Sequence, residues 1–173
     1  MVAIVPPVAI QTNRIDLHPI AAADVRALAT LMCEPAVLVW MPAMGVSLSI
    51  DAAVTMFETS VSNAESHGAF DLVAVRRNDG ALMGQVTIPS PGGKLEFWLG
   101  LPFWGYGYAT EMVNAALQLL AAHDAADLLT ARVHRDNLAS RKVLEKTGFR
   151  LTGEAWCRFD SYKNPLPILD YSL

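Results

Sequence analysis

The sequence predicts an α/β fold, in which one mixed sheet carries helices on both faces. Its apolar patterns alternate along 173 residues in the order β-α-α-β-β-β-α-β-α-β-β. A tight-turn signal joins two neighbouring strands as an antiparallel hairpin, and a helix links the strands at 95–99 and 129–133 as a βαβ crossover. The sheet should therefore combine antiparallel and parallel pairs, with helices covering both faces. We expect a single domain over residues 10–173, preceded by an arm at 1–9.

The first elements follow from periodicity and from helix boundary signals. Residues 10–18 alternate between the two faces of a predicted strand. A helix then opens after Pro19, buries one apolar face and ends at Pro35. A second helix, capped by Ser47 or Ser49, carries apolar residues at helical spacing and finishes near 67–68.

The boundaries of the remaining elements are marked by turn and helix-end signals in the sequence. Asn78-Asp79-Gly80 predicts a tight turn between two strands, and Gly148 is a natural left-handed end for the last helix. The predicted strands are 70–76, 82–88, 95–99, 129–133, 149–156 and 168–173, and the predicted helices begin near 109 and at 137.

Composition limits the function. The net charge is −4 without a basic run, so no nucleic-acid surface is predicted. Cys33 and Cys157 lie far apart and the four histidines are scattered, which argues against a metal site. No apolar stretch is long enough for a membrane span, and two unpaired cysteines without a signal peptide lead us to expect a cytoplasmic protein.

A glycine-containing loop, Trp104-Gly105-Tyr106-Gly107-Tyr108-Ala109, joins the strand at 95–99 to the following helix. Its glycines let backbone N–H groups approach an anion at a helix N-terminus, which suits a diphosphate. Thr110 stands where a Rossmann loop needs its third glycine, and no Gly-Lys-Ser/Thr follows, which excludes a P-loop. A plain strand-to-helix turn is the structural alternative.

Four motifs in order make the sequence resemble the GNAT superfamily of N-acetyltransferases, and within it the RimJ/RimL-like group, named for ribosomal-protein N-terminal acetyltransferases. They are residues 12–19 (TNRIDLHP), 97–99 (FWL), 104–111 (WGYGYATE) and 137–149, which runs from NLAS to GF. The resemblance implies transfer of an acetyl group from acetyl-CoA to a primary amine, within a mostly antiparallel sheet splayed between its fourth and fifth strands.

The resemblance also implies a cofactor site. Pantetheine would pair with the backbone of the fourth strand, and the pyrophosphate would lie on the glycine loop. Asn137 matches an asparagine that binds pantetheine or backbone, although a simple helix cap fits it equally well. Tyr106 replaces a common Lys or Arg, so either the affinity for CoA is somewhat lower or Arg141 and Lys142 supply the positive charge. The implied cofactor residues are Leu99, Gly100, Leu101, Trp104, Gly105, Tyr106, Gly107, Tyr108, Ala109, Thr110, Asn137, Ser140 and Arg141.

Catalytic assignments stay open between several residues. Leu144 takes the place of the tyrosine that protonates the leaving thiolate in many relatives, and Ser140 resembles the general acid of RimL-like enzymes. A first-turn helix serine is its alternative role. Glu96, Asp160 and His134 are the candidate general bases, each of which could also be an ordinary surface residue, and a water chain could replace them.

The acceptor cleft should contain apolar side chains, for which Trp40, Met41, Phe70 and Trp98 are the candidates. Core packing is their alternative role. Two rival functions remain, a CoA-binding module with little catalysis and a scaffold in which the glycine loop is only a turn. The resemblance is also compatible with a homodimer formed through the final strands.

Overall fold

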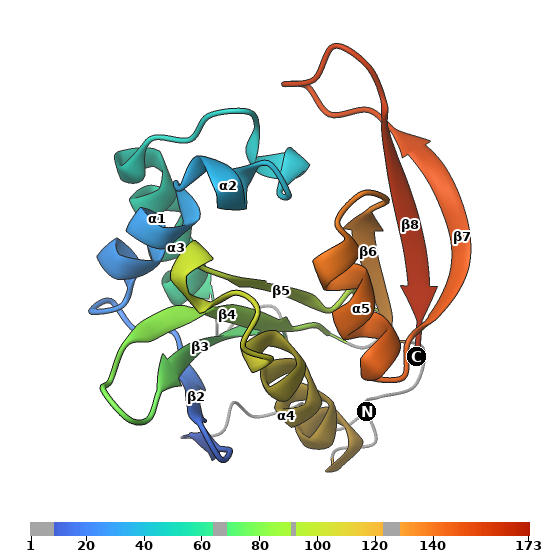
Figure 1. Cartoon of the computed structure of the whole chain (residues 1–173). Helices are drawn as coiled ribbons and strands as arrows, with labels where there is room; N and C mark the ends of the chain where they lie inside the picture. The colour runs from blue at the N-terminus through green and yellow to red at the C-terminus, as the bar shows by residue number, and fades with distance from the viewer. Residues whose placement is uncertain (1–8, 64–68, 91–92, 123–128) are drawn as a thin grey trace.

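The computed structural model describes residues 9–63, 69–90, 93–122 and 129–173, whose strands form two antiparallel sheets (Figure 1). The larger sheet has the order β1-β2-β3-β4-β5, and the smaller has the order β6-β8-β7. The predicted arm and the predicted end of the second helix at 67–68 lie outside the described residues. The strands are β1 Ile10–Gln11, β2 Ile15–Pro19, β3 Phe70–Arg76, β4 Leu82–Ile88, β5 Glu96–Leu99, β6 Thr130–His134, β7 Arg150–Cys157 and β8 Leu166–Ser172.

The two sheets meet where β5 and β6 begin. The Leu95 N–H donates to the Thr130 carbonyl at 2.8 Å, and Lys94 and Thr130 form an isolated parallel bridge. Farther along, β5 and β6 separate into their own sheets (Figure 1). The predicted α/β class, the mostly antiparallel pairing and the splay are confirmed, and the parallel pairing expected between these two strands is present as this single bridge.

Helices cover both faces of the larger sheet, as the sequence predicts. Helix α4 (Tyr108–Ala122) packs Met112, Val113, Ala116 and Leu120 against one face. Helices α1 (Val25–Met32) and α3 (Ile50–Asn63) pack Leu28 and Phe57 against Val73 on the opposite face. Helix α5 (Leu138–Lys146) lies beside β6, with Leu144 buried.

The N-terminal region departs from the prediction in two places. The expected strand 10–18 is a hairpin, because Thr12 caps a turn in which its N–H donates to the Ile15 carbonyl and its hydroxyl oxygen accepts the Ile15 N–H. Pro35 begins the short helix α2 (Pro35–Leu38) instead of ending α1, since proline is well suited to a first helical position. Between the candidate caps of α3, the Ser49 hydroxyl accepts the Ala52 N–H, so Ser49 is the cap.

Two short 3₁₀ helices escape the sequence prediction, η1 (Pro42–Met44) and η2 (Leu101–Phe103). The first lies between α2 and α3, and the second lies between the end of β5 and the start of α4 (Figure 1). Among the helices that the structure describes, none combines the length and the hydropathy needed to cross a membrane.

Gly84 lets β4 approach β5 closely. It pairs with Leu99, and a Cβ at this position would lie 2.2 Å from the Trp98 carbonyl oxygen and 2.8 Å from the Leu99 Cα. Both neighbours are backbone atoms and cannot rotate away. A side chain at this position would therefore push β5 out of register beside the gap.

We expect Gly84→Ala to lower the free energy of unfolding by about 2–3 kcal/mol or more, as overpacking against backbone does. Gly80→Ala is the matched control, because Gly80 has φ +71° but open space around its Cβ position. The control should cost only about 1–2 kcal/mol, the price of a left-handed alanine. Urea unfolding of both variants checks this, and equal losses would contradict the steric explanation.

Candidate active site

The gap between β5 and β6 places one backbone amide of the larger sheet in an unusual position. The Gly100 N–H donates to the Met83 carbonyl at 2.8 Å, so it points toward β4. Because N–H groups alternate along a strand, the Leu99 N–H points the other way, on the side where Leu95 bonds to Thr130. A hydrogen-bond donor thus faces the gap at the end of β5.

The carbonyl groups of the predicted pantetheine-binding segment, residues 99–101, and the Gly100 N–H already have partners. The Leu99 carbonyl accepts the Trp104 indole N–H at 2.6 Å. The Gly100 carbonyl accepts the Phe103 N–H at 3.0 Å, and Leu101 begins the turn of η2. The chain leaves the extended conformation at Leu101, and a role of residues 99–101 in binding pantetheine stays a prediction.

The glycine loop requires its glycines for their backbone conformation. Gly105 has φ +83° and Gly107 has φ +80°, the left-handed region that glycine adopts at little cost. The first intrahelical N–H bond of α4 runs from Glu111 to the Gly107 carbonyl at 3.2 Å, which leaves the earlier N–H groups of the helix without intrahelical acceptors. The loop and the helix start together offer several donors suited to an anion.

Helix α5 approaches the gap from the other sheet and begins at a capped position. The Asn137 side-chain oxygen accepts the Ser140 N–H at 3.1 Å, and Asn137 is buried. The helix-cap role is therefore confirmed. Ser140 is half-buried in the first turn, where its backbone N–H is held by the cap.

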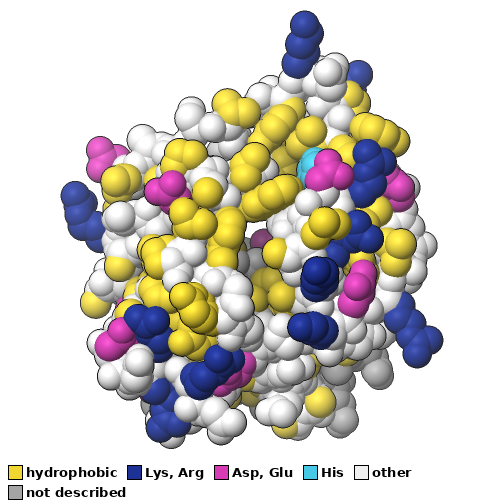
Figure 2. All heavy atoms as spheres, viewed as in Figure 1, with side chains coloured by type: hydrophobic (Ala, Val, Ile, Leu, Met, Phe, Trp, Pro, Cys, Tyr) yellow, Lys and Arg dark blue, Asp and Glu magenta, His cyan; other side chains and the backbone are white. Residues whose placement is uncertain are grey.

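Positive charge accompanies α5. Arg141 donates from Nη1 to the Arg135 carbonyl at 3.1 Å, while its buried Nε has no partner among the described residues. Figure 2 shows Lys and Arg side chains gathered over α5, beside a hollow whose surroundings are largely hydrophobic. An anion on the glycine loop would therefore lie opposite a cationic helix face.

Glu96 stands on β5 with a carboxyl group that resists ionisation. It pairs with Thr87, which in turn pairs with Asp71, so the three side chains share the sheet face that α3 covers. Asp71 is held by hydrogen bonds from Ser60 and from Thr87, the latter 2.6 Å long. Although Glu96 keeps an exposed surface, partial burial raises the pKa of its carboxyl, and the Asp71 charge raises it further against the opposing effect of Lys94.

Asp160 and His134 lie in different surroundings. Asp160 is exposed in the β7–β8 connection, where Arg158 and Asp160 line an open hollow opposite Pro42–Met44 of η1. His134 ends β6, and its Nδ1 accepts the Asp136 N–H at 3.1 Å. The neutral ring therefore carries its proton on Nε2, so accepting a further proton would require breaking that bond.

The candidate acceptor residues divide between surface and core. Trp40 follows α2 and lies 6.0 Å from the His134 ring, which connects the helical side of the gap to β6. Met41 and Trp98 are partly buried on the α1–α3 face, with Trp98 6.4 Å from Phe57. Phe70 is only 4% exposed and belongs to the core beneath α4, so its predicted place in the cleft is corrected.

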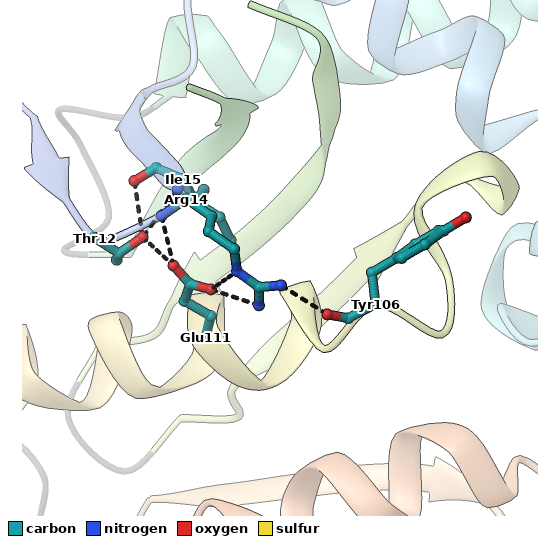
Figure 3. Close-up of polar contacts among 5 residues, drawn as sticks. All are labelled: Thr12, Arg14, Ile15, Tyr106 and Glu111. Atoms are coloured by element: carbon teal, nitrogen blue, oxygen red, sulfur yellow. Dashed lines mark hydrogen bonds and ion pairs between the residues drawn. The ribbon is translucent and has the colours of Figure 1, made fainter. Parts of the chain in front are cut away.

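Sequence reasoning assigned no role to Arg14 and Glu111. Arg14, in the β1–β2 turn, binds both Glu111 of α4 and the Tyr106 carbonyl of the glycine loop (Figure 3). Arg14 belongs to the motif at 12–19 and Glu111 to the motif at 104–111. Their opposite charges were the one sign in the sequence that the two residues could form an ion pair. Nothing in a one-dimensional pattern shows that positions 97 apart are in contact.

Comparisons with known proteins agree with this arrangement. Residues 14–150 match the family model described as an acetyltransferase (GNAT) domain. Similar solved structures include a GNAT-family acetyltransferase from Bacillus anthracis, with 16% identity, TM-score 0.81, and 95% of this chain and 97% of that chain covered.

Two further structures are named for particular acceptors. An acetyltransferase from Salmonella typhimurium that modifies the N-terminal serine of ribosomal protein L7/L12 has 16% identity and TM-score 0.78, with 95% and 98% of the two chains covered. Spermidine N-acetyltransferase from Vibrio cholerae, in complex with CoA and spermine, has 15% identity and TM-score 0.76, with 94% and 96% covered. At these identities the likeness shows a shared fold.

The Asn137 cap gives a direct test of local structure. We expect Asn137→Ala to lower the free energy of unfolding by about 1 kcal/mol, because the Ser140 N–H loses its acceptor, while Asn137→Ser keeps most of the stability. Urea denaturation monitored by circular dichroism measures both. An alanine variant as stable as the serine variant would show that the cap contributes nothing.

Proposed function

We propose, since the chain belongs to the acetyltransferase (GNAT) family, that the gap between β5 and β6 is where it transfers an acetyl group from acetyl-CoA to a primary amine. Family membership makes the chain an acetyl-CoA-dependent N-acetyltransferase. The observation that carries the placement is the Leu99 N–H, which faces the gap directly before the glycine loop.

Donor binding in this proposal uses backbone more than side chains. The pyrophosphate lies on the N–H groups of the loop from Trp104 to Ala109 and of Thr110, where positive φ at Gly105 and Gly107 and the start of α4 present donors. The charge of Arg141 and Lys142 on α5 adds attraction. These residues fit a diphosphate because the loop supplies donors and the buried Arg141 Nε lacks a partner among the described residues.

Acetyl-CoA supplies a thioester, and the chain must stabilise the oxyanion and move protons. As the amine nitrogen bonds to the acetyl carbon, the carbon–sulfur bond breaks, the amine loses one proton and the thiolate gains one. The Leu99 N–H is the donor we assign to the oxyanion. The Leu99 carbonyl is held by Trp104, which fixes the strand end beside it.

The proton-transfer residues are proposed from position. Leu144 is 1% exposed in the core and offers no proton to the leaving thiolate. Ser140, half-buried in the first turn of α5, is our candidate for protonating the thiolate. Glu96 is the preferred base, because its raised pKa suits proton acceptance closer to neutral pH. Asp160 on the opposite rim is the alternative, and the Nδ1 bond of His134 weighs against that residue.

Acceptor recognition is assigned to Trp40, Met41 and Trp98 on the helical side of the gap. We propose a RimJ/RimL-like enzyme that accepts a peptide N-terminus or a small amine. In support, similar structures act on an N-terminal serine and on spermidine, both of which are primary amines. We also propose a location in the reducing cytoplasm, in support of which Cys33 and Cys157 are free thiols. We propose a homodimer as well, because the edge strand β7 exposes the apolar side chains of Leu151 and Trp156.

Donor binding can be tested without knowing the acceptor. Saturating acetyl-CoA should raise the unfolding temperature of the protein, because a ligand that binds only the native state stabilises it by mass action. Gly107→Glu should abolish the shift by placing a carboxylate on the loop. Gly80→Glu is its matched control, with a similar φ of +71° in the β3–β4 turn, and should keep the shift. No shift in the unmodified protein would refute the proposed function.

The general base can be identified by pH dependence. If Glu96 accepts the proton, kcat/KM falls as the pH drops through its raised pKa, because only the ionised carboxylate can act. Glu96→Gln should then lower kcat by about 100-fold and abolish the fall of kcat/KM at low pH. Glu58→Gln, at an exposed position, is the control and should change neither kcat nor the pH dependence.

The assay uses the best acceptor from a panel of serine and alanine peptides and polyamines. Since the amine itself also titrates, the informative quantity is the difference between the profiles of variant and parent. If the fall of kcat/KM at low pH disappears in Asp160→Asn and persists in Glu96→Gln, the general base is Asp160 and not Glu96.

A further inference from the structure

We propose that Arg14 is a positioning residue for the cofactor loop, whose guanidinium holds the Tyr106 carbonyl and so fixes the direction of the Gly107 N–H. The inference rests on the proposed function, because it takes the loop as the diphosphate site. It assigns the β1–β2 turn, far from the loop in sequence, to donor binding. Arg14 acts through the loop and does not itself contact the diphosphate.

The contacts of Arg14 form a bridge between three parts of the chain. Nη1 donates to the Tyr106 carbonyl at 2.9 Å. Nε and Nη2 both lie 2.7 Å from Oε2 of Glu111 in the first turn of α4. Figure 3 shows the side chain reaching from the hairpin toward both groups. The planar guanidinium suits this geometry, because its donors are held in a fixed fork.

Glu111 is itself anchored to the hairpin. Its Oε1 accepts the Thr12 hydroxyl at 2.6 Å and the Arg14 N–H at 2.9 Å. Burial opposes ionisation of this carboxyl, but the bonds from Thr12 and Arg14 outweigh it and hold the pKa of Glu111 below its ordinary value. The pair therefore stays charged at neutral pH, and its contribution to stability is lost only as the pH falls through that lowered pKa.

The effect on the loop follows from peptide geometry. The Tyr106 carbonyl and the Gly107 N–H belong to one planar trans unit, so they point in opposite directions. With the carbonyl bound to Arg14, the N–H is directed away from it. The neighbouring glycines have no side chains to restrict rotation, so this bond supplies a restraint that the loop sequence lacks.

The charge balance separates positioning from direct binding. All three guanidinium nitrogens of Arg14 are engaged with Glu111 or Tyr106, and the group also lies 4.6 Å from the Tyr108 ring centroid. Glu111 neutralises its charge locally. Arg14→Met would leave the Glu111 carboxylate unpaired, whereas Arg14→Lys keeps the charge balance and removes only the fork, so Arg14→Lys is the variant that separates loop geometry from electrostatic potential.

The experiment measures the dissociation constant of CoA by isothermal titration calorimetry, alongside the unfolding temperature. Arg14→Met should weaken CoA binding by about tenfold, the loss that follows from one charge-assisted hydrogen bond. Glu111→Gln should give a smaller loss in the same direction, since the fork loses its charged partner. Arg14→Lys keeps the charge but not the fork, so it should bind CoA nearly as weakly as Arg14→Met.

Arg77→Met is the matched control. Arg77 also anchors the hairpin, through the Thr12 carbonyl at 2.8 Å and an ion pair with Asp16 at 3.4 Å, but these bonds leave the loop untouched. It should lose stability without losing CoA affinity. Unchanged affinity in Arg14→Met, or an equal loss in Arg77→Met, would overturn the positioning role, as would full affinity in Arg14→Lys. Failure of the unmodified protein to bind CoA would instead refute the proposed function on which the inference rests.

Discussion

Beyond the hydrogen bond from Leu95 to Thr130, β5 and β6 no longer pair, and this separation is the constraint on which the rest of the site depends. Backbone groups at a sheet edge need partners, so the end of β5 must find them elsewhere. The Trp104 indole takes the Leu99 carbonyl, and η2 uses the groups that follow. The Leu99 N–H at this strand end faces the gap, and it is available because β5 and β6 have diverged.

The surrounding elements hold that edge in place from several directions. Gly84 permits β4 to lie close against Leu99, so the strand end is supported from behind. Helix α4 fixes the loop from one face of the sheet, and the β1–β2 turn reaches the same loop through Arg14 and Glu111. Helix α5 brings the Asn137 cap and its cationic side from the smaller sheet. A backbone-built site thus depends on contacts between segments distant in sequence.

Much of this could be predicted from the sequence where the signal is local. A few neighbouring residues are enough to predict the Asn78-Asp79-Gly80 turn, the apolar stripe of α4 and the glycine conformations at 105 and 107. The structure agrees with these three predictions. Non-local outcomes could not be predicted. Alternation along 10–18 does not reveal that Thr12 bends the chain, and an aromatic residue such as Phe70 looks the same whether it lines a cleft or fills the core.

The two sides of the gap are built from separate stretches of chain. The proposed donor elements come from residues 99–111 and 137–141. Residues 42–45 and the β7–β8 connection at 158–161 line the open hollow, and they come close at one point, where a Cβ at Gly45 would lie 2.9 Å from the Ser161 Oγ. Because this rim of the hollow and the proposed donor elements belong to separate stretches of chain, substitutions at the rim can change the proposed acceptor side of the gap and leave unaltered the backbone that we propose for the thioester.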